Sequence, residues 1–159
     1  DRLEMIFHLA NLGDSKTLTP AVRLEVAGRI MKESLSWGLG WASHGEIDRL
    51  NILAASLLPM RRAVLALSVA PEEVVVDGLH PPDLSCPVRC VVKADGSVPE
   101  VMAASILAKT ARDAWMTDYA LLEPRYGFDR HMGYPTPEHR RCVRLLGPCP
   151  IHRRSFRVS

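Results

Sequence analysis

The sequence predicts an α/β fold, and two observations carry this prediction. Short runs rich in β-branched residues, at 74–77 and 88–93, have the composition of buried strands. Longer stretches with helical periodicity precede and follow them, and strands that alternate with such helices favour parallel pairing. The chain has 159 residues, 47% of them hydrophobic and 24% charged, so it is long and apolar enough for one domain with a substantial core.

The first half of the chain is predicted to contain a helix, a strand and a second helix. Thr19 can cap a helix over 20–33, whose first residue is a proline that suits that position. Over 34–42, Leu and Trp alternate with small residues, and this period of two predicts a strand. The second helix is expected over 46–67, with Pro59 kinking or splitting it.

The second half is predicted to be mainly helical after the two short strands. A long helix is expected from about Pro99 to Leu122, followed over 126–137 by a loop rich in Gly, Pro and aromatic residues. A last helix is expected over 138–146.

The end of the chain is strongly basic, although the formal net charge of the whole chain is only +2. An uncompensated basic segment favours contact with phosphate groups, and a solvated terminus is the alternative. Residues 139–159 contain no Asp or Glu and six arginines, which are Arg140, Arg141, Arg144, Arg153, Arg154 and Arg157.

The cysteines favour reduced structural thiols over a metal site. Zinc ligands usually come in pairs separated by two residues, whereas the gaps here are three residues between Cys86 and Cys90 and six between Cys142 and Cys149. The histidines are also scattered without metal-ligand spacing, and we expect them at the surface or in loops. We expect a reduced, cytoplasmic setting. No apolar run approaches the roughly 18 residues that span a bilayer, so no membrane partner is expected.

Two aspartates follow the predicted strands at their carboxyl ends. Asp77 ends the valine-rich run at 74–76, and Asp95 comes shortly after the strand at 88–93. Ligands of α/β sheets bind beyond the carboxyl ends of the strands, and paired carboxylates suit Mg²⁺ or Mn²⁺. The alternative is that each aspartate only caps the turn that follows it.

Several stretches, in a fixed order, resemble the ribonuclease HII family. The longest match is VPEVMAASILAKTARD at 98–113. Each short motif is weak alone, but their order and spacing match together along nearly the whole chain. The other stretches lie at 13–18, 46–53, 76–78, 91–95, 126–128, 131–136 and 152–156.

The resemblance implies an endonuclease that cuts the RNA strand of RNA–DNA hybrids and cuts at single ribonucleotides in duplex DNA. It would use two divalent ions, Mn²⁺ or Mg²⁺, and leave a 5′-phosphate and a 3′-hydroxyl. Intact family members are expected to be monomers. Asp113, in the longest motif, is expected to be structural and to pair with Arg112 or a nearby loop. The resemblance assigns Asp77 and Asp95 to the metals, and Ser15, Lys16, Tyr134, Arg153 and Arg154 to the substrate.

The family's first motif, Asp-Glu-x-Gly-Arg-Gly, has no match in residues 1–13. In the family it supplies two further carboxylates and lies on the central strands of the sheet. We therefore expect a ribonuclease H-like mixed sheet flanked by helices that lacks its N-terminal central strands. The core would span about 1–122 and a helical C-terminal extension 123–159, within one domain.

From this missing motif we expect a truncated chain with weak or no activity. Two alternatives are a non-catalytic nucleic-acid-binding remnant and a zinc-stabilised interaction module built on the four cysteines.

Overall fold

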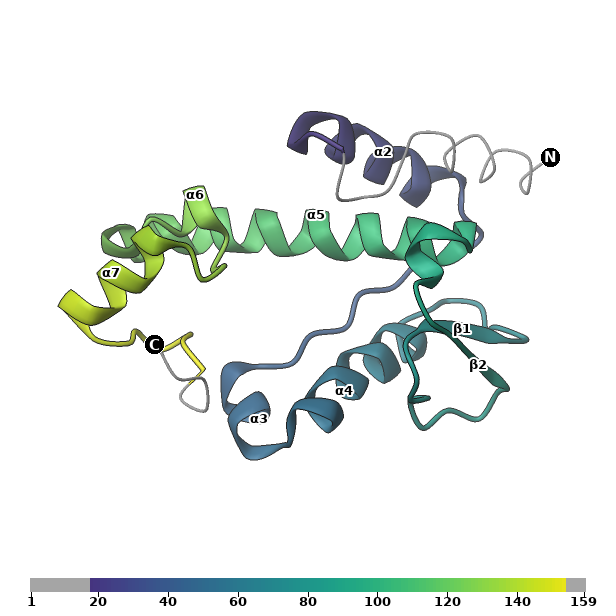
Figure 1. Ribbon diagram of the computed structural model, residues 1–159. Helices are drawn as coiled ribbons and strands as arrows, with labels where there is room; N and C mark the ends of the chain where they lie inside the picture. The colour runs from purple at the N-terminus through teal and green to yellow at the C-terminus, as the bar shows by residue number, and fades with distance from the viewer. Residues whose placement is uncertain (1–17, 154–159) are drawn as a thin grey trace.

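The computed structural model describes residues 18–153, which form an α/β fold as predicted. Helix α5 crosses the middle of the molecule, with α2 along one side and α6 and α7 at its far end (Figure 1). The elements are α2 (Pro20–Glu33), α3 (His44–Arg49), α4 (Ile52–Leu65), β1 (Val74–Asp77), β2 (Val88–Val91), η1 (Ala94–Gly96), α5 (Pro99–Leu122), η2 (Pro124–Tyr126), α6 (Phe128–His131) and α7 (Pro137–Leu146).

The two predicted valine-rich strands pair in parallel, which confirms that prediction. The register places Val74 opposite Val88 and Asp77 opposite Val91. Strand β2 ends at Val91, two residues earlier than expected. Lys93 adopts a left-handed conformation with φ of 58°, and this residue turns the chain directly into the short helix η1. Asp77 and Asp95 thus follow neighbouring strands at the same edge of the sheet.

The strand predicted over 34–42 is wrong. Residues 36–43 form an irregular segment, and no strand of the described residues pairs with it. The backbone of this segment instead packs closely on α4 at its glycines. A Cβ added to Gly40 would lie 1.9 Å from the carbonyl oxygen of Pro59. A Cβ on Gly38 would lie 2.5 Å from that of Ala63. The alternation of small and large residues therefore reflects close packing of a backbone on a helix.

The single helix predicted over 46–67 is also wrong, because the chain breaks at Leu50 and Asn51 and not at Pro59. Ser43 and Glu46 form a capping box that starts α3. The Asn51 side chain accepts a hydrogen bond of 2.8 Å from the Ala54 N–H and starts α4, which continues through Pro59. A local side-chain cap thus decides the boundary more strongly than the proline does.

A bidentate ion pair joins α3 to α4 across this break. Arg62 contacts the two carboxylate oxygens of Glu46 at 2.6 and 3.0 Å and also donates to the Trp41 carbonyl at 2.6 Å. The hydrogen bonds from Arg62 are the first cause that lowers the pKa of Glu46 to about 2. This pair fixes α3 and the preceding segment on α4.

The remaining helices agree with the sequence except in one loop. Thr19 caps α2, and α5 covers Pro99–Leu122 as predicted. Helix α7 begins at Pro137, one residue earlier than expected. The stretch predicted as a loop over 126–137 is wrong in part, because it contains the end of η2 and the four-residue helix α6.

Helix α5 contributes to two separate cores. Its N-terminal half packs Met102 and Ile106 against Val26, Ala27 and Ile30 of α2. Its C-terminal half supplies Met116 and Ala120 to a second core, which is completed by Tyr126, Phe128, Val143 and Cys149. Burial on both halves fixes this helix as the frame that positions the loops around it.

Asp113 connects α2 with α5 between these two cores. Its Oδ2 lies 2.7 Å from Nη1 of Arg23, whose side chain is 9% exposed, and its Oδ1 lies 2.8 Å from Nζ of Lys109. The structural role expected for Asp113 is therefore confirmed, but its partners are Arg23 and Lys109 and not Arg112. The spacing of Lys109 and Asp113, one helical turn apart, places both on one face of α5.

Replacing Asp113 with Asn should destabilise the protein by about 3 kcal/mol, because it leaves the buried Arg23 guanidinium without its counter-charge. Urea unfolding measures this change. The matched control is Glu73→Gln, which removes an ion pair with Arg89. The Arg89 and Glu73 side chains are 54% and 50% exposed, so this substitution should lower the free energy of unfolding by under about 0.5 kcal/mol. Equal effects of the two substitutions would contradict a buried role for Asp113.

Candidate nucleic-acid interface and carboxylate edge

The carboxyl ends of β1 and β2 bring the two predicted aspartates to one edge. Asp77 is exposed at the end of β1, and its Oδ1 accepts a hydrogen bond of 3.1 Å from the N–H of Ala94. Ala94 directly precedes Asp95, which lies in η1. This bond ties the Asp77 side chain to the loop that carries the second aspartate. This contact differs from the turn-capping alternative, in which Asp77 would bond to the turn that directly follows it, and it orients the Asp77 carboxylate.

The carboxylate oxygens at this edge are suitable ligands for a hard divalent cation, but two carboxylates are too few to complete a site. Carboxylate oxygens are the ligands that Mg²⁺ and Mn²⁺ prefer. Within residues 18–153, however, no group of three or more His, Cys, Asp or Glu side chains could hold a metal ion. Asp77 and Asp95 alone therefore do not make a complete site.

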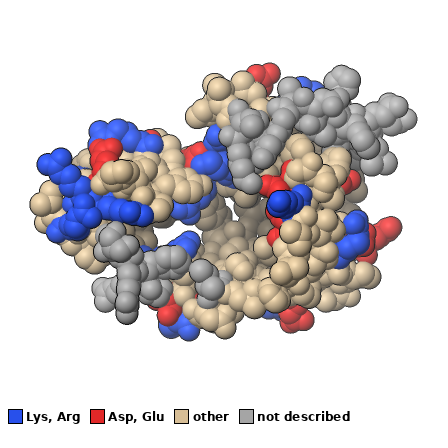
Figure 2. Space-filling view, viewed as in Figure 1, with Lys and Arg blue, Asp and Glu red and all other residues tan. Residues whose placement is uncertain are grey.

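An open apolar cavity of about 1000 Å³ lies beside the carboxylates. Figure 2 shows the hollow between the layer that contains α5 and the layer that contains α4. Asp77 and Asp95 lie among its lining residues, together with one face of α5 that extends as far as Ala111. Most of the lining is apolar, from Trp37 and Leu39 of the irregular segment to Val74 of β1.

Tyr134 lies against two cations near the middle of α5. Its side chain is 48% exposed. Lys109 Nζ lies 3.5 Å from the Tyr134 hydroxyl and 4.8 Å from the ring centroid, and the Arg112 guanidinium carbon lies 5.9 Å from the same centroid. We call these three residues the cation–tyrosine cluster. A half-exposed ring flanked by positive charge suits contact with a sugar–phosphate backbone.

A tight turn positions Tyr134 on α5. Met132 and Gly133 both have positive φ, 50° and 77°. The Arg112 side chain donates to the Met132 carbonyl at 3.4 Å, and the Tyr134 N–H donates to the carbonyl of His131 at 2.8 Å. The turn is therefore fixed by one bond to α5 and one bond to the end of α6.

Arg153 is the one predicted basic contact of the C-terminal segment that lies within the described residues. Desolvation and then the charge of Arg112 lower its pKa, whereas Asp48 raises it. The charge of Arg112, a member of the cation–tyrosine cluster, thus acts on Arg153. Lysine and arginine side chains gather over the end of the molecule formed by α6 and α7 (Figure 2). Ser15, Lys16 and Arg154 lie outside the described residues.

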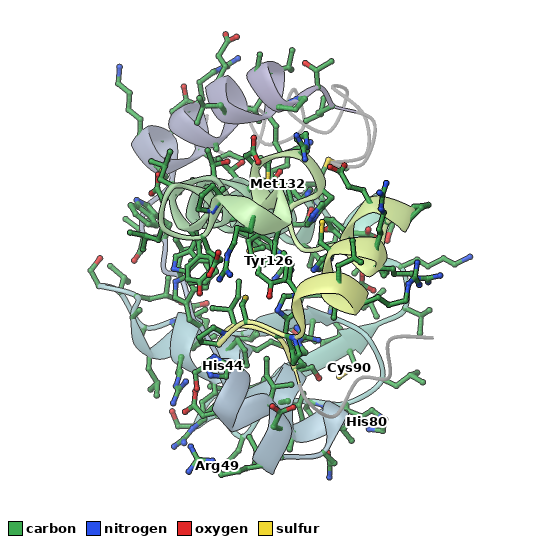
Figure 3. The ribbon with its side chains drawn as sticks, turned by 90° about the vertical axis from the view of Figure 1, so that its left-hand side faces the viewer. His44, Arg49, His80, Cys90, Tyr126 and Met132 are labelled. Carbon is green, nitrogen blue, oxygen red and sulfur yellow. The ribbon has the colours of Figure 1, made fainter. Side chains whose placement is uncertain are left out.

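The expectation that the histidines lie at the surface or in loops is wrong for His131 and His139, which are buried in helices, whereas His152 lies in a bend after α7. His131 and His139 are 6% and 8% exposed, and their rings stack at 4.2 Å between centroids. His152 packs beside them, with its Nε2 2.8 Å from that of His139. Each sits in a short helix or turn, and only the fold brings the three together. The backbone carbonyl of Tyr126 bonds to the His131 ring. In Figure 3, Tyr126 lies in the half formed by α5, α6 and α7, whereas His44 and Arg49 lie on α3.

The cysteines do not support the zinc-stabilised alternative. Cys86 and Cys90 lie before and within β2, whereas Cys142 and Cys149 contribute to the second core beside α7. All four are free thiols. None of the described helices is long and apolar enough to cross a membrane.

Sequence reasoning missed the functional surroundings of Tyr134. Lys109 and Arg112 lie in the longest motif, but no role was assigned to them. Their spacing of three residues on a predicted helix places both on one face, and this signal was available. The contact with Tyr134 was not available, because it depends on how the turn at 132–133 folds back on α5.

Replacing Gly133 with Ala should destabilise the protein by about 1–2 kcal/mol, because its φ of 77° is unfavourable for a residue with a Cβ. That Cβ would also lie 2.8 Å from Cε of Met116. The control is Gly28→Ala on the exposed face of α2, where an added Cβ has no neighbouring atom within 4 Å. This substitution should stabilise the protein by about 0.5–1 kcal/mol, because alanine favours a helix more than glycine does. Thermal unfolding measures both, and a Gly133 variant as stable as the original chain would contradict the role of the turn.

Comparison with known proteins gives a consistent result. The family model for ribonuclease HII matches residues 1–159. The ribonuclease HII of Moorella thermoacetica is 51% identical over 149 residues, which cover 94% of this chain and 72% of that protein. The ribonuclease HII of Nitrosococcus oceani is 50% identical over 149 residues, which cover 94% of this chain and 74% of that protein.

A solved structure supports the fold. The crystal structure of the ribonuclease H2 from Pyrococcus horikoshii matches with a TM-score of 0.78 and 24% identity, over 96% of this chain and 81% of that one. The family match over the whole chain and relatives of about 50% identity confirm the resemblance: the chain belongs to the ribonuclease HII family of endoribonucleases.

Proposed function

We propose that this chain recognises RNA–DNA hybrids and duplex DNA that contains single ribonucleotides, and contributes to cleavage 5′ to the ribonucleotide. The observation that carries the proposal is the cation–tyrosine cluster on a member of the ribonuclease HII family. Tyr134 would pack on the sugar at the junction between ribonucleotide and DNA. The ribose 2′-hydroxyl is the group that distinguishes RNA from DNA at such a contact.

The basic residues would bind the phosphates on either side of that sugar. Lys109 and Arg112 lie against Tyr134, so a nucleotide on the ring places its phosphates within reach of their charges. Arg153, near Arg112, would extend the positive surface. We propose Ser15, Lys16 and Arg154 as further substrate contacts on the basis of the family resemblance alone.

Asp77 and Asp95 would hold divalent metal, Mg²⁺ or Mn²⁺. A bound ion of this kind supplies an activated water and stabilises the leaving oxygen of the phosphodiester. Asp77 is oriented for this role by the Ala94 N–H, which leaves its second oxygen open. Because these two carboxylates do not complete a site within the described residues, we propose that the chain by itself cleaves weakly or not at all.

A non-catalytic nucleic-acid-binding role is the second candidate. One observation favours it: the cation–tyrosine cluster is formed in full by described residues, whereas the carboxylate edge contributes only two ligands. We therefore expect binding and cleavage to be separable in experiments on this chain.

A labelled DNA duplex with one ribonucleotide, incubated with the purified chain and Mn²⁺, tests the catalytic proposal. We expect cleavage at least a hundredfold slower than by an intact family member, because a metal site that acts as a unit loses most of its rate when ligands are missing. Asp77→Asn should remove any residual cleavage while hybrid binding remains. Rapid cleavage that survives Asp77→Asn would contradict the assignment of this carboxylate.

Hybrid binding at several salt concentrations tests the cation–tyrosine cluster. Tyr134→Ala should weaken binding by about tenfold at every salt concentration, because it removes stacking and not charge. Arg112→Met should reduce the slope of log K against log salt by about 0.9, the effect of one lost phosphate contact.

The matched control for Arg112→Met is Lys32→Met, which removes a positive charge from the exposed last turn of α2. It should leave both the affinity and the slope nearly unchanged. An equal effect of Lys32→Met and Arg112→Met would indicate attraction by net charge alone and would contradict a defined interface.

A further inference from the structure

Three imidazoles form a connected group behind Tyr134, and we call them the histidine cluster: His131 at the end of α6, His139 in α7 and His152 after α7. The planes of the His131 and His139 rings lie within 11° of each other. Nε2 of His139 and Nε2 of His152 are 2.8 Å apart. Phe128 packs against all three rings, at 5.5–5.7 Å between centroids.

Backbone groups determine which nitrogen of each ring carries the proton. A backbone N–H can only donate and a carbonyl can only accept. His152 Nδ1 therefore accepts from the Cys149 N–H at 2.9 Å, and the His152 proton lies on Nε2. This proton points at Nε2 of His139, which accepts it, so the His139 proton lies on Nδ1 and is donated to the Tyr134 carbonyl at 2.9 Å.

The same argument fixes the third ring. His131 Nε2 lies 2.7 Å from the Tyr126 carbonyl and must donate, while its Nδ1 accepts from the Gly133 N–H at 3.2 Å. All three imidazoles are therefore neutral, and every ring nitrogen is already used. A further proton on any of the three rings would sit on a nitrogen that now accepts a hydrogen bond, so the new N–H would point at the N–H of its present donor.

The cluster holds the peptide groups on both sides of Tyr134. The Gly133 N–H contacts His131, the Tyr134 N–H donates to the His131 carbonyl, and the Tyr134 carbonyl accepts from His139. The Thr136 N–H also donates to the Tyr134 carbonyl, at 2.8 Å. The ring of Tyr134 is thus set against Lys109 and Arg112 by bonds that depend on the histidines.

The groups that face the cluster are aromatic rings, one thiol, a further histidine and one carboxylate. Tyr126 of η2 packs on His152 at 5.1 Å, and Cys149 Sγ lies 3.0 Å from His152 Nδ1. Tyr119 of α5 packs on Phe128 at 5.7 Å. On the side of α3, His44 and Asp48 lie with Cys149 around a small cavity.

Acid should weaken this arrangement. Burial is the first cause that lowers the pKa of His139 and of His152, and the charge of a neighbouring imidazole lowers each further. An unfolded histidine has a pKa of about 6.5. Below that pH the unfolded or released state binds more protons than the folded one, so the folded arrangement loses stability as the pH falls, and gains nothing above it.

We propose that His139 is a positioning residue for Tyr134, and that the histidine cluster makes the position of Tyr134 depend on pH. When the cluster is neutral, His139 holds the Tyr134 carbonyl and the ring stays against Lys109 and Arg112. When the cluster is protonated, the turn at 132–134 is released. The consequence for substrate rests on the proposed function, whereas the coupling of His139 to Tyr134 does not.

The chain has six histidines and three tyrosines, few enough to resolve by NMR. At pH 7.5, ¹⁵N imidazole spectra should show the Nδ1–H tautomer for His139 and the Nε2–H tautomer for His131 and His152. With ¹³C-labelled tyrosine, the Tyr134 ring signal should move reversibly between pH 7 and pH 5, together with the signals of His139 and His152.

Two substitutions separate the contacts of His139. In His139→Asn the amide N–H lies near the position of Nδ1 and keeps the bond to Tyr134, so the Tyr134 signal and hybrid binding should stay within about twofold of the original chain at pH 7.5. In His139→Gln the amide lies near the position of Nε2, so the bond to Tyr134 is lost. The Tyr134 signal should then shift at pH 7.5, and binding should weaken by about tenfold, the effect of one hydrogen bond.

A different tautomer of His139, or a Tyr134 signal unchanged both by His139→Gln and down to pH 5, would overturn the proposal. If the variants fail to fold, the tautomers and the pH titration of the original chain decide the question. A Tyr134 signal that moves as expected without any change in hybrid binding would support the positioning role and remove Tyr134 from the proposed substrate contacts.

Discussion

The double contact of Asp113 is the interaction on which the rest of the structure depends. One carboxylate oxygen neutralises Arg23, which α2 buries against α5, and the other holds Lys109 on the exposed face of the same helix. A buried guanidinium without a counter-charge is costly, so α2 and α5 must pack in the one arrangement that brings Arg23 to Asp113. Lys109, one of the two cations that contact Tyr134, is thus fixed by the same carboxylate that joins α2 to α5.

The cation–tyrosine cluster and the two aspartates lie at different places along α5. The cation–tyrosine cluster is near its middle, where positive charge attracts phosphate. The two aspartates lie near its N-terminal end, beyond the strands β1 and β2, where their negative charge attracts divalent cations. In the proposed function, this separation would keep lysine and arginine from neutralising the carboxylates that hold the metal.

Much of the fold could be predicted from local signals in the sequence, whereas contacts between distant segments could not. Thr19, Pro99 and the valines of β1 act through short-range effects, so their elements were predicted correctly. The segment over 34–42 has the alternation of a strand, but a strand also needs a partner. Gly38 and Gly40 instead serve contact with α4, which no local pattern shows. The site follows the same rule. Asp77 and Asp95 were found from the ends of strands, whereas the histidine cluster depends on three elements that meet only after folding.

We propose that the described residues form the substrate-recognition half of a ribonuclease HII site around Tyr134. The most direct measurement is the change in the amide spectrum of the ¹⁵N-labelled chain when a DNA duplex with one ribonucleotide is added without metal. The account predicts that the largest shifts fall at Lys109, Arg112 and residues 132–136, and that an all-DNA duplex gives smaller ones. Shifts confined to other surfaces, or equal shifts with both duplexes, would contradict it.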